Sequence, residues 1–199
     1  MRTLFVVMAF LLMFGQTAVA NDLTDVENLV KEKIGIVVNL LRDKNIDQVT
    51  KNRKIVDSLK PVLDFQKMAK LSLGRRYWPK LSKSKKKEFS NLFIDRMQES
   101  FLEKLGLYTD EEIVFDKATR KKKKIYVMAN LVGKDSKIQM LFKFYKSKKG
   151  WKAYDVEIMK ISIVQTYRSQ FHGVLKKGNI DDLLAKMRKT GQFKLKTEK

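Results

Sequence analysis

The chain has 199 residues, no cysteine, a single histidine and a formal net charge of +21. This composition excludes disulfides and any metal site built from several histidine or cysteine ligands, so we expect no cofactor and a fold stabilised by apolar burial. Such a basic balance is typical of proteins that bind nucleic acid or an anionic membrane surface, and it also occurs on surfaces that are simply solvated.

The first 20 residues have the features of a secretory signal peptide. Arg2 precedes an uncharged apolar run over residues 4–14, and Ala18 and Ala20 supply the small-residue pattern that signal peptidase cleaves. The run is too short to span a bilayer as a helix, which takes about 20 residues; the alternative is an uncleaved anchor. We therefore expect cleavage after Ala20 and export of the mature chain, which argues against nucleic acid as a partner.

The next part of the chain is predicted to be helical, because apolar residues recur at steps of three and four. Pro61 is expected to break the chain, Gly74 stands where a helix C-cap glycine belongs, and Ser82 or Ser84 can cap the start of the longest helix. We expect helices over residues 22–43, 46–59, 64–73 and 82–107. The last of these has an apolar row that consists of Phe89, Phe93, Met97, Phe101 and Leu105.

The period then changes to the alternation of β-strands. Short connections between these strands predict an antiparallel meander. Two helices close the chain, one after Ser162 and one starting near Asn179. We expect strands over residues 112–118, 124–133, 136–146 and 151–158. The prediction is one α+β domain over residues 21–191, with N-terminal helices, a four-stranded antiparallel sheet and two C-terminal helices, and then a charged flexible tail over residues 192–199.

The central strands carry apolar residues on both faces. Ile125, Val127 and Leu131 alternate with Tyr126 and Met128 in one strand, and the next strand follows the same pattern. An antiparallel sheet with one face in water should alternate apolar and polar residues instead. Two explanations stay open: helices cover both faces, or an apolar ligand cavity lies between the sheet and the helices.

Few residues could carry catalysis. His172 is expected on the rim of a helix, and the sequence has neither a nucleophile elbow nor a Gly-rich phosphate loop. Asp155 lies in a predicted strand, where burial could tune its carboxyl group for acid–base chemistry; the alternative is a surface or structurally hydrogen-bonded residue. We predict no catalytic site, and an enzyme that uses Asp155 remains an alternative.

Three blocks of the sequence share their order and spacing with a known family. The first runs over residues 61–97, with the order D…MA…LG…W…S…F…F; the second, GWKAYDVEI, covers residues 150–158; the third begins SIVQTYRSQF at Ser162. Behind a signal peptide, this arrangement resembles the MlaC family, also called toluene-tolerance auxiliary proteins. Family members usually carry Glu-Gly where this chain has Met159 and Lys160. Gly would permit a sharp turn there and Lys160 does not, which leaves the geometry of this turn open.

The resemblance implies a periplasmic phospholipid carrier, with bound phospholipid as cargo and no catalytic group. Such a protein encloses acyl chains between a sheet and helices and carries lipid between the outer and inner membranes. The implied partners are an inner-membrane MlaD-type ABC transporter complex and an outer-membrane MlaA-type lipoprotein complex, with transient contact to membrane surfaces and a monomeric carrier. Another apolar cargo, such as a hopanoid, and a basic adaptor without a cavity are the alternatives.

The expected lipid-binding residues are apolar and are chosen by the face on which they lie. They are Phe93, Met97, Phe101, Val127, Leu131, Met140, Phe142, Phe144, Val156, Val164, Tyr167 and Phe171. Two basic clusters are expected to contact anionic headgroups or acidic partner surfaces. They consist of Lys85, Lys86 and Lys87, and of Arg120, Lys121, Lys122, Lys123 and Lys124.

Overall fold

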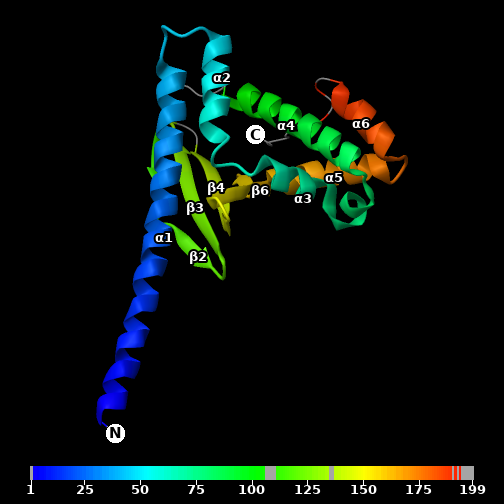
Figure 1. Cartoon of the computed structure of the whole chain (residues 1–199). Coiled ribbons are helices and arrows are strands. Elements are labelled where there is room, and N and C mark those ends of the chain that lie inside the picture. The colour runs from blue at the N-terminus through cyan, green and yellow to red at the C-terminus, as the bar shows by residue number, and fades with distance from the viewer. Residues whose placement is uncertain (1, 106–110, 135–136, 190, 192, 194–199) are drawn as a thin grey trace.

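The computed structural model of the chain describes residues 2–105, 111–134, 137–189, 191 and 193; for residues 2–20 and residue 104 it describes the backbone alone. Figure 1 shows the elements of this part of the chain. The helices are α1 (Arg2–Arg42), α2 (Gln48–Leu59), α3 (Phe65–Tyr77), the short 3₁₀-helix η1 (Trp78–Lys80), α4 (Lys83–Leu105), α5 (Ile163–Leu175) and α6 (Ile180–Arg188). The strands are β1 (Glu112–Phe115), β2 (Thr119–Lys121), β3 (Lys124–Val132), β4 (Lys137–Ser147), β5 (Gly150–Ile158) and β6 (Ile161–Ser162).

The α+β class predicted from the sequence is confirmed, although the sheet has more strands than the four expected. It is antiparallel, in the order β1-β3-β4-β5-β6, and β2 pairs with β3 beside β1. The predicted strands are β1, β3, β4 and β5. The two that the prediction missed, β2 and β6, have only three and two residues, too few for an alternating pattern to stand out.

The first predicted helix, over residues 22–43, forms the second part of α1, which ends at Arg42 and extends beyond the prediction only toward the N-terminus. Val26, Val30 and Val37 of the predicted apolar face are buried. Residues 2–20, the predicted signal peptide, are the first part of the same helix, and Figure 1 shows this part extending away from the rest of the molecule. Among the residues that the structure describes in full, no helix is both long and apolar enough to cross a membrane.

The interior contains two apolar cores. The helical core lies among α3, α4, α5 and α6 and is built around Phe89, Phe93, Tyr167 and Phe171. The sheet core lies between α1 and one face of β3, β4 and β5. Leu63 and Phe142 are half-buried and pack against both cores. The junction between the cores therefore lies at the α2–α3 connection and the middle of β4.

The α2–α3 connection is attached to the edge of the sheet. The Ala153 amide donates to the Val62 carbonyl at 2.9 Å, and the Asp64 amide donates to the Ala153 carbonyl at 2.8 Å. These bonds form a parallel bridge between Leu63 and Ala153. The Asp64 carboxylate then caps α3 by accepting from the Lys67 amide at 2.9 Å. The start of α3 is thus fixed relative to β5.

The second face of the sheet, opposite the sheet core, carries aromatic residues that stay half-exposed. Tyr126, Tyr145 and Tyr154 lie on it, and each has a lysine ammonium over its ring. The distances from ammonium to ring centre are 5.5 Å for Lys121 over Tyr126, 3.3 Å for Lys67 over Tyr145 and 4.7 Å for Lys124 over Tyr154. Lysines, together with the start of α3, therefore shield the aromatic part of this face.

The predicted helix caps are present, whereas the turn after β5 differs from expectation. The hydroxyls of Ser82 and Ser162 accept from the amides three residues later. Met159 and Lys160 form a two-residue hairpin turn between β5 and β6, with φ of 51° and 67°. Positive φ at both central positions is the pattern of a type I′ turn, so this chain makes a sharp turn without the glycine.

Candidate functional site

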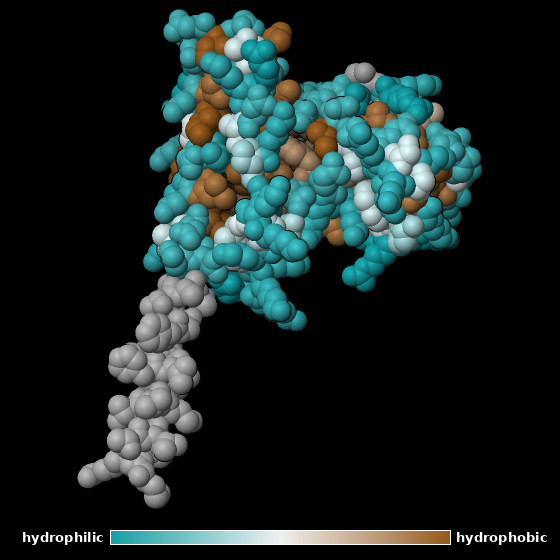
Figure 2. Space-filling model, in the orientation of Figure 1, coloured by the Kyte–Doolittle hydropathy of each residue, from teal (hydrophilic) through white to brown (hydrophobic). Residues whose placement is uncertain are grey.

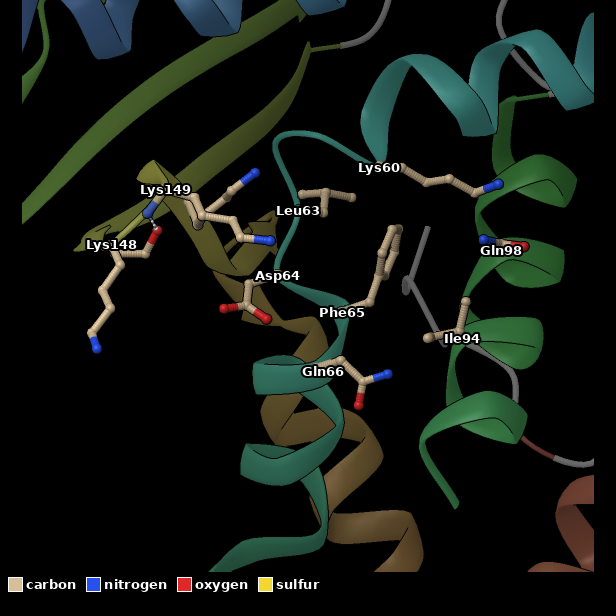
Figure 3. Close-up of a pocket in the computed structure, with 11 residues that line it drawn as sticks. Lys60, Leu63, Asp64, Phe65, Gln66, Ile94, Gln98, Lys148 and Lys149 are labelled. Carbon is tan, nitrogen blue, oxygen red and sulfur yellow. Dashed lines mark hydrogen bonds between the residues drawn. The ribbon is translucent and has the colours of Figure 1, made fainter. Parts of the chain in front are cut away.

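An open groove of about 530 Å³ lies at the junction of the two cores. The α2–α3 connection, the middle of α4 and the turn between β4 and β5 form its walls. Figure 3 shows Leu63 and Phe65 in the space between the connection and α4. Ile94 and Gln98 lie on α4, on the other side of this space. The groove is lined by Lys60, Leu63, Asp64, Phe65, Gln66, Ile94, Gln98, Ser147, Lys148, Lys149 and Lys152.

The interior of the groove is mostly apolar, and its rim is basic. Leu63, Phe65 and Ile94 supply the apolar lining. Figure 2 shows hydrophobic residues gathered in the recess between the α1–α2 side of the molecule and its helical part, surrounded by hydrophilic surface. An apolar recess with a charged rim fits an amphiphile, because the apolar part of the ligand leaves water while its polar end stays solvated.

The groove continues as a narrow space between α2 and α4. Val56 and Leu59 of α2 face Met97 and Phe101 of α4 across it, and its free volume is only about 10 Å³. Leu63, Phe65 and Gln98 line both spaces, so the two are neighbours. A small separation of α2 from α4 would lengthen the groove toward Phe101.

The predicted lipid-binding residues fall into three groups. Met97 and Phe101 line the narrow space between α2 and α4. Leu131, Met140 and Phe142 are half-buried on the sheet face toward the helices. The other seven, Phe93, Val127, Phe144, Val156, Val164, Tyr167 and Phe171, are buried in the two cores.

The aromatic members of the third group pack against one another. The Phe93 and Tyr167 ring centres are 5.2 Å apart in an edge-to-face arrangement, and those of Phe89 and Phe171 are 5.4 Å apart. Phe193, within the segment predicted to be a flexible tail, is buried against Phe171 at 5.2 Å; residues 192 and 194–199 of that segment lie outside the described residues. These rings fill the helical core.

Sequence reasoning predicted none of the residues that line the groove, and only Met97 and Phe101 of the narrow space beside it. Ile94 and Gln98 follow Phe93 and Met97 by one position each on α4, so they lie beside the apolar row that the sequence indicated. Leu63 and Phe65 flank the residue that caps α3, and nothing local marks them as lining a groove. The cluster Lys148–Lys149 between two strands was a usable signal, since a basic hairpin turn is exposed wherever the sheet lies.

Asp155 is buried and holds the start of α5 in place. Its carboxylate accepts from the Ser162 hydroxyl at 2.7 Å and from the Val164 amide at 3.2 Å. It also pairs with the Lys143 ammonium at 3.2 Å. Burial acts to lower the pKa of Lys143, but the hydrogen bond that its ammonium donates to Glu157 and the charge of Asp155 outweigh it, so the pKa is raised. These contacts indicate that Asp155 has a structural role at the start of α5.

Asp64, unlike Asp155, lines the groove. The Tyr145 hydroxyl donates to it, and the pKa of Tyr145 is raised to about 12 by burial and by this bond. Tyr145 therefore stays protonated at neutral pH. In this arrangement the Asp64 carboxylate is held by protein donors at the edge of the groove.

The two predicted basic clusters lie apart from each other, and each has one member in an ion pair. The β2–β3 turn and the start of α4 occupy separate parts of the molecule (Figure 1). Lys85 pairs with Asp181 at 2.7 Å, joining α4 to α6. Arg120 pairs with Asp22 at 3.0 Å, joining β2 to α1. Among the described residues, Lys122 and Lys123 at the tip of the turn have no ion-pair partner.

His172 lies beside a second hollow, of about 390 Å³, between α3 and α5. Its Nδ1 is 3.5 Å from the Tyr77 hydroxyl, and Arg76 and Arg168 line the same hollow. Gly74 interrupts α3 here with φ of 80°, and a β-carbon at this position would meet the Arg168 guanidinium at 3.0 Å. Within the described residues, no group of three or more His, Cys, Asp or Glu side chains could hold a metal ion.

Comparison with known families decides the identity of the chain. The family model described as MlaC protein matches residues 30–189. The chain belongs to the MlaC family. The resemblance read from the three sequence blocks is thereby confirmed. No curated protein matches the sequence.

Solved structures share the fold of this MlaC-family chain. One of them is the phospholipid-binding protein from Ralstonia solanacearum, determined in complex with a phospholipid. The two chains are 19% identical, with a TM-score of 0.73, and the match covers 81% of this chain and 94% of the other. At this identity, the likeness establishes the α+β architecture.

Proposed function

We propose that this MlaC-family protein is a periplasmic phospholipid carrier. The acyl chains of the bound lipid lie in the groove between α4, the α2–α3 connection and the β4–β5 turn. The observation that carries the proposal is the apolar groove of about 530 Å³ with its basic rim. The family of the chain and a fold shared with a protein solved with a phospholipid support the choice of cargo.

The physical task of such a carrier is to remove acyl chains from water and to release them again. Each methylene group buried from water gains about 0.8 kcal/mol, so two chains of about 15 methylenes represent roughly 24 kcal/mol. The groove must provide a comparable apolar environment without binding the lipid much more tightly than a bilayer does. Side chains such as Leu63, Phe65 and Ile94 meet this demand because they contact the chain without directional bonds.

The size of the groove sets how a two-chain lipid fits. If a methylene fills about the volume of a liquid water molecule, about 30 Å³, the groove holds roughly 18 methylenes, or about one acyl chain. The second chain takes the path between α2 and α4, past Met97 and Phe101, where the free space is now about 10 Å³. Loading therefore includes a movement of α2 away from α4.

We further propose how the protein is exported, where it docks and that it acts without catalysis. A signal peptide over residues 1–20 directs the chain to the periplasm, where it works as a monomer. Basic residues at the β2–β3 turn and at the start of α4 contact anionic membranes, an inner-membrane ABC transporter complex and an outer-membrane lipoprotein complex. The protein acts by binding rather than catalysis, since Asp155 is engaged by three protein donors.

The test is transfer of a fluorescent phospholipid between vesicles by the wild type and by the Ile94→Glu variant. A carboxylate in the groove would have to be desolvated when a chain binds, so we expect transfer to fall at least tenfold. Leu71→Glu is the matched control, because Leu71 is an exposed apolar residue of α3 outside the groove. Equal transfer by both variants, with thermal stability unchanged, would refute the groove as the lipid site.

A further inference from the structure

The rim of the groove has an excess of positive charge. Lys60, Lys148, Lys149 and Lys152 line it together with a single carboxylate, that of Asp64. That carboxylate already accepts from the Lys67 amide and the Tyr145 hydroxyl. The charge that a ligand headgroup meets at this rim is therefore set by the lysines.

Two of the four lysines are engaged by the protein. The Lys60 ammonium pairs with Asp57 at 2.7 Å. The Lys152 ammonium donates to the Pro61 carbonyl, and so belongs to the contact between β5 and the α2–α3 connection. Both contacts reduce the charge available to a ligand.

The other two lysines are free to meet a ligand. Lys148 and Lys149 are exposed and form the two-residue turn between β4 and β5. Among the described residues, no carboxylate pairs with either ammonium. The Lys149 backbone amide donates to the Ser147 hydroxyl at 3.1 Å, which leaves the side chain unengaged. Figure 3 shows this turn at the edge of the groove, across from Leu63 and Phe65. Two exposed lysines without a carboxylate partner among the described residues thus lie at the edge of the apolar groove. In Figure 3 the Lys148 side chain points away from Leu63 and Phe65, so it would have to turn to reach a ligand there.

We infer that the groove selects phospholipids with a net negative headgroup, and that Lys148 and Lys149 recognise it. This inference rests on the proposed function, because it concerns the same groove. Phosphatidylglycerol and phosphatidylethanolamine share a phosphate diester, so selection between them comes from the rest of the headgroup. The ammonium of ethanolamine adds a positive charge beside the two lysines, which opposes binding, whereas glycerol adds none. The preference weakens as salt screens these charges.

The experiment measures which lipid the protein extracts from one population of vesicles. The vesicles contain equal amounts of phosphatidylglycerol and phosphatidylethanolamine with identical acyl chains, at low salt. The full chain, purified without detergent, is incubated with them and separated, and native mass spectrometry gives the ratio of the two bound lipids. We expect the wild type to favour phosphatidylglycerol by about fivefold or more, the effect expected for one lysine against one anionic group.

Two variants assign the preference to the rim. In Lys148→Ser/Lys149→Ser, we expect the ratio to fall to about one. Lys176→Ser/Lys177→Ser loses the same charge at the exposed end of α5, and we expect it to keep the wild-type ratio. Both pairs of substitutions are at exposed positions outside the cores, so folding should be retained. Inorganic phosphate at millimolar concentration is expected to leave the loaded lipid bound, because it offers nothing to the apolar groove.

Each outcome has a distinct meaning. If the wild type loads both lipids equally, the headgroup inference is overturned and the carrier function stands. If the rim variant and the control variant lose the preference equally, overall charge produces it and the assignment to Lys148 and Lys149 is overturned. If inorganic phosphate displaces the lipid, the site recognises free phosphate instead. If no lipid is taken up at all, the proposed function itself fails.

Discussion

At the scale of single residues, Asp22 connects the first helix to the sheet. Its carboxylate accepts from the Lys146 ammonium at 2.7 Å, the Trp151 indole at 2.9 Å and the Arg120 guanidinium at 3.0 Å. The hydrogen bonds from Lys146 and Trp151 are the main reason that the pKa of Asp22 is lowered from 3.8 to about 2. If the chain is cleaved after Ala20, Asp22 becomes the second residue of the mature protein and ties its new end to the sheet core.

The pKa of Asp22 predicts how its contribution to stability depends on pH. A carboxyl group whose pKa is lower in the folded state stabilises the fold above its unfolded pKa, near 4, and loses this effect as the pH falls to about 2. For Asp22→Asn we expect the free energy of unfolding at pH 7 to fall by about 2 kcal/mol. Urea unfolding monitored by circular dichroism should show the difference between wild type and variant shrinking between pH 4 and 2.

The control for this prediction lies on the same helix. Asp25 is exposed and, within the described part of the chain, its side chain has no hydrogen-bond or ion-pair partner. Asp25→Asn therefore changes the charge equally and should leave the stability within about 0.5 kcal/mol of wild type. If Asp22→Asn changed the free energy of unfolding at pH 7 as little as the control, the hydrogen bonds of Asp22 between α1 and the sheet would contribute nothing to stability.

At the scale of elements, local periodicity predicted most helices and strands well. The valines of α1 and the apolar row of α4 follow steps of three and four; Val26, Val30 and Val37 are buried, and so are the first three members of the α4 row, while Phe101 and Leu105 are half-buried. The groove was not predictable in this way, because it depends on the bridge between Leu63 and Ala153, residues 90 positions apart that come together only in the fold. The same limit explains why apolar periodicity could not separate Phe101, which is half-buried and lines the narrow space between α2 and α4, from Phe93, which is buried in the helical core.

The backbone of the β5–β6 turn is strained at Lys160, and a substitution there can measure the strain. Lys160 adopts φ of 67°, a left-handed conformation that costs an L-residue about 1 kcal/mol and glycine almost nothing. We therefore expect Lys160→Gly to raise the free energy of unfolding by about 0.5–1 kcal/mol, despite the greater freedom of glycine in the unfolded chain. Thermal and urea unfolding would measure the change.

The same substitution in a helix should have the opposite sign. Lys54 lies within α2 and is exposed, so Lys54→Gly is expected to lower the stability by about 1 kcal/mol. A lower stability for Lys160→Gly as well would contradict the left-handed geometry of the turn.

At the scale of the whole molecule, positive charge is spread over separate surfaces, and their functions can be distinguished. Lys122 and Lys123 at the tip of the β2–β3 turn lie outside the groove. We expect Lys122→Asn/Lys123→Ser to weaken binding to anionic vesicles at low salt by about fivefold per lysine, with lipid selectivity unchanged. Asparagine is chosen because Lys122 has φ of 57°, which asparagine tolerates.

Vesicle co-sedimentation at low and high salt would test this docking surface. The difference between variant and wild type should disappear at about 1 M salt, where charges are screened beyond about 3 Å. Binding that is unaltered at low salt would exclude the β2–β3 turn from membrane docking and leave the start of α4 as the remaining predicted cluster.

The whole molecule combines two cores with a groove at their junction, and the central claim is that this groove carries a phospholipid. The most direct measurement is native mass spectrometry of the protein purified without detergent from an exporting host, with analysis of the extracted lipid. We predict an adduct of phospholipid mass at about one per chain; a hopanoid mass would keep the carrier but change its cargo. Bare protein that also takes no lipid from vesicles would contradict the account.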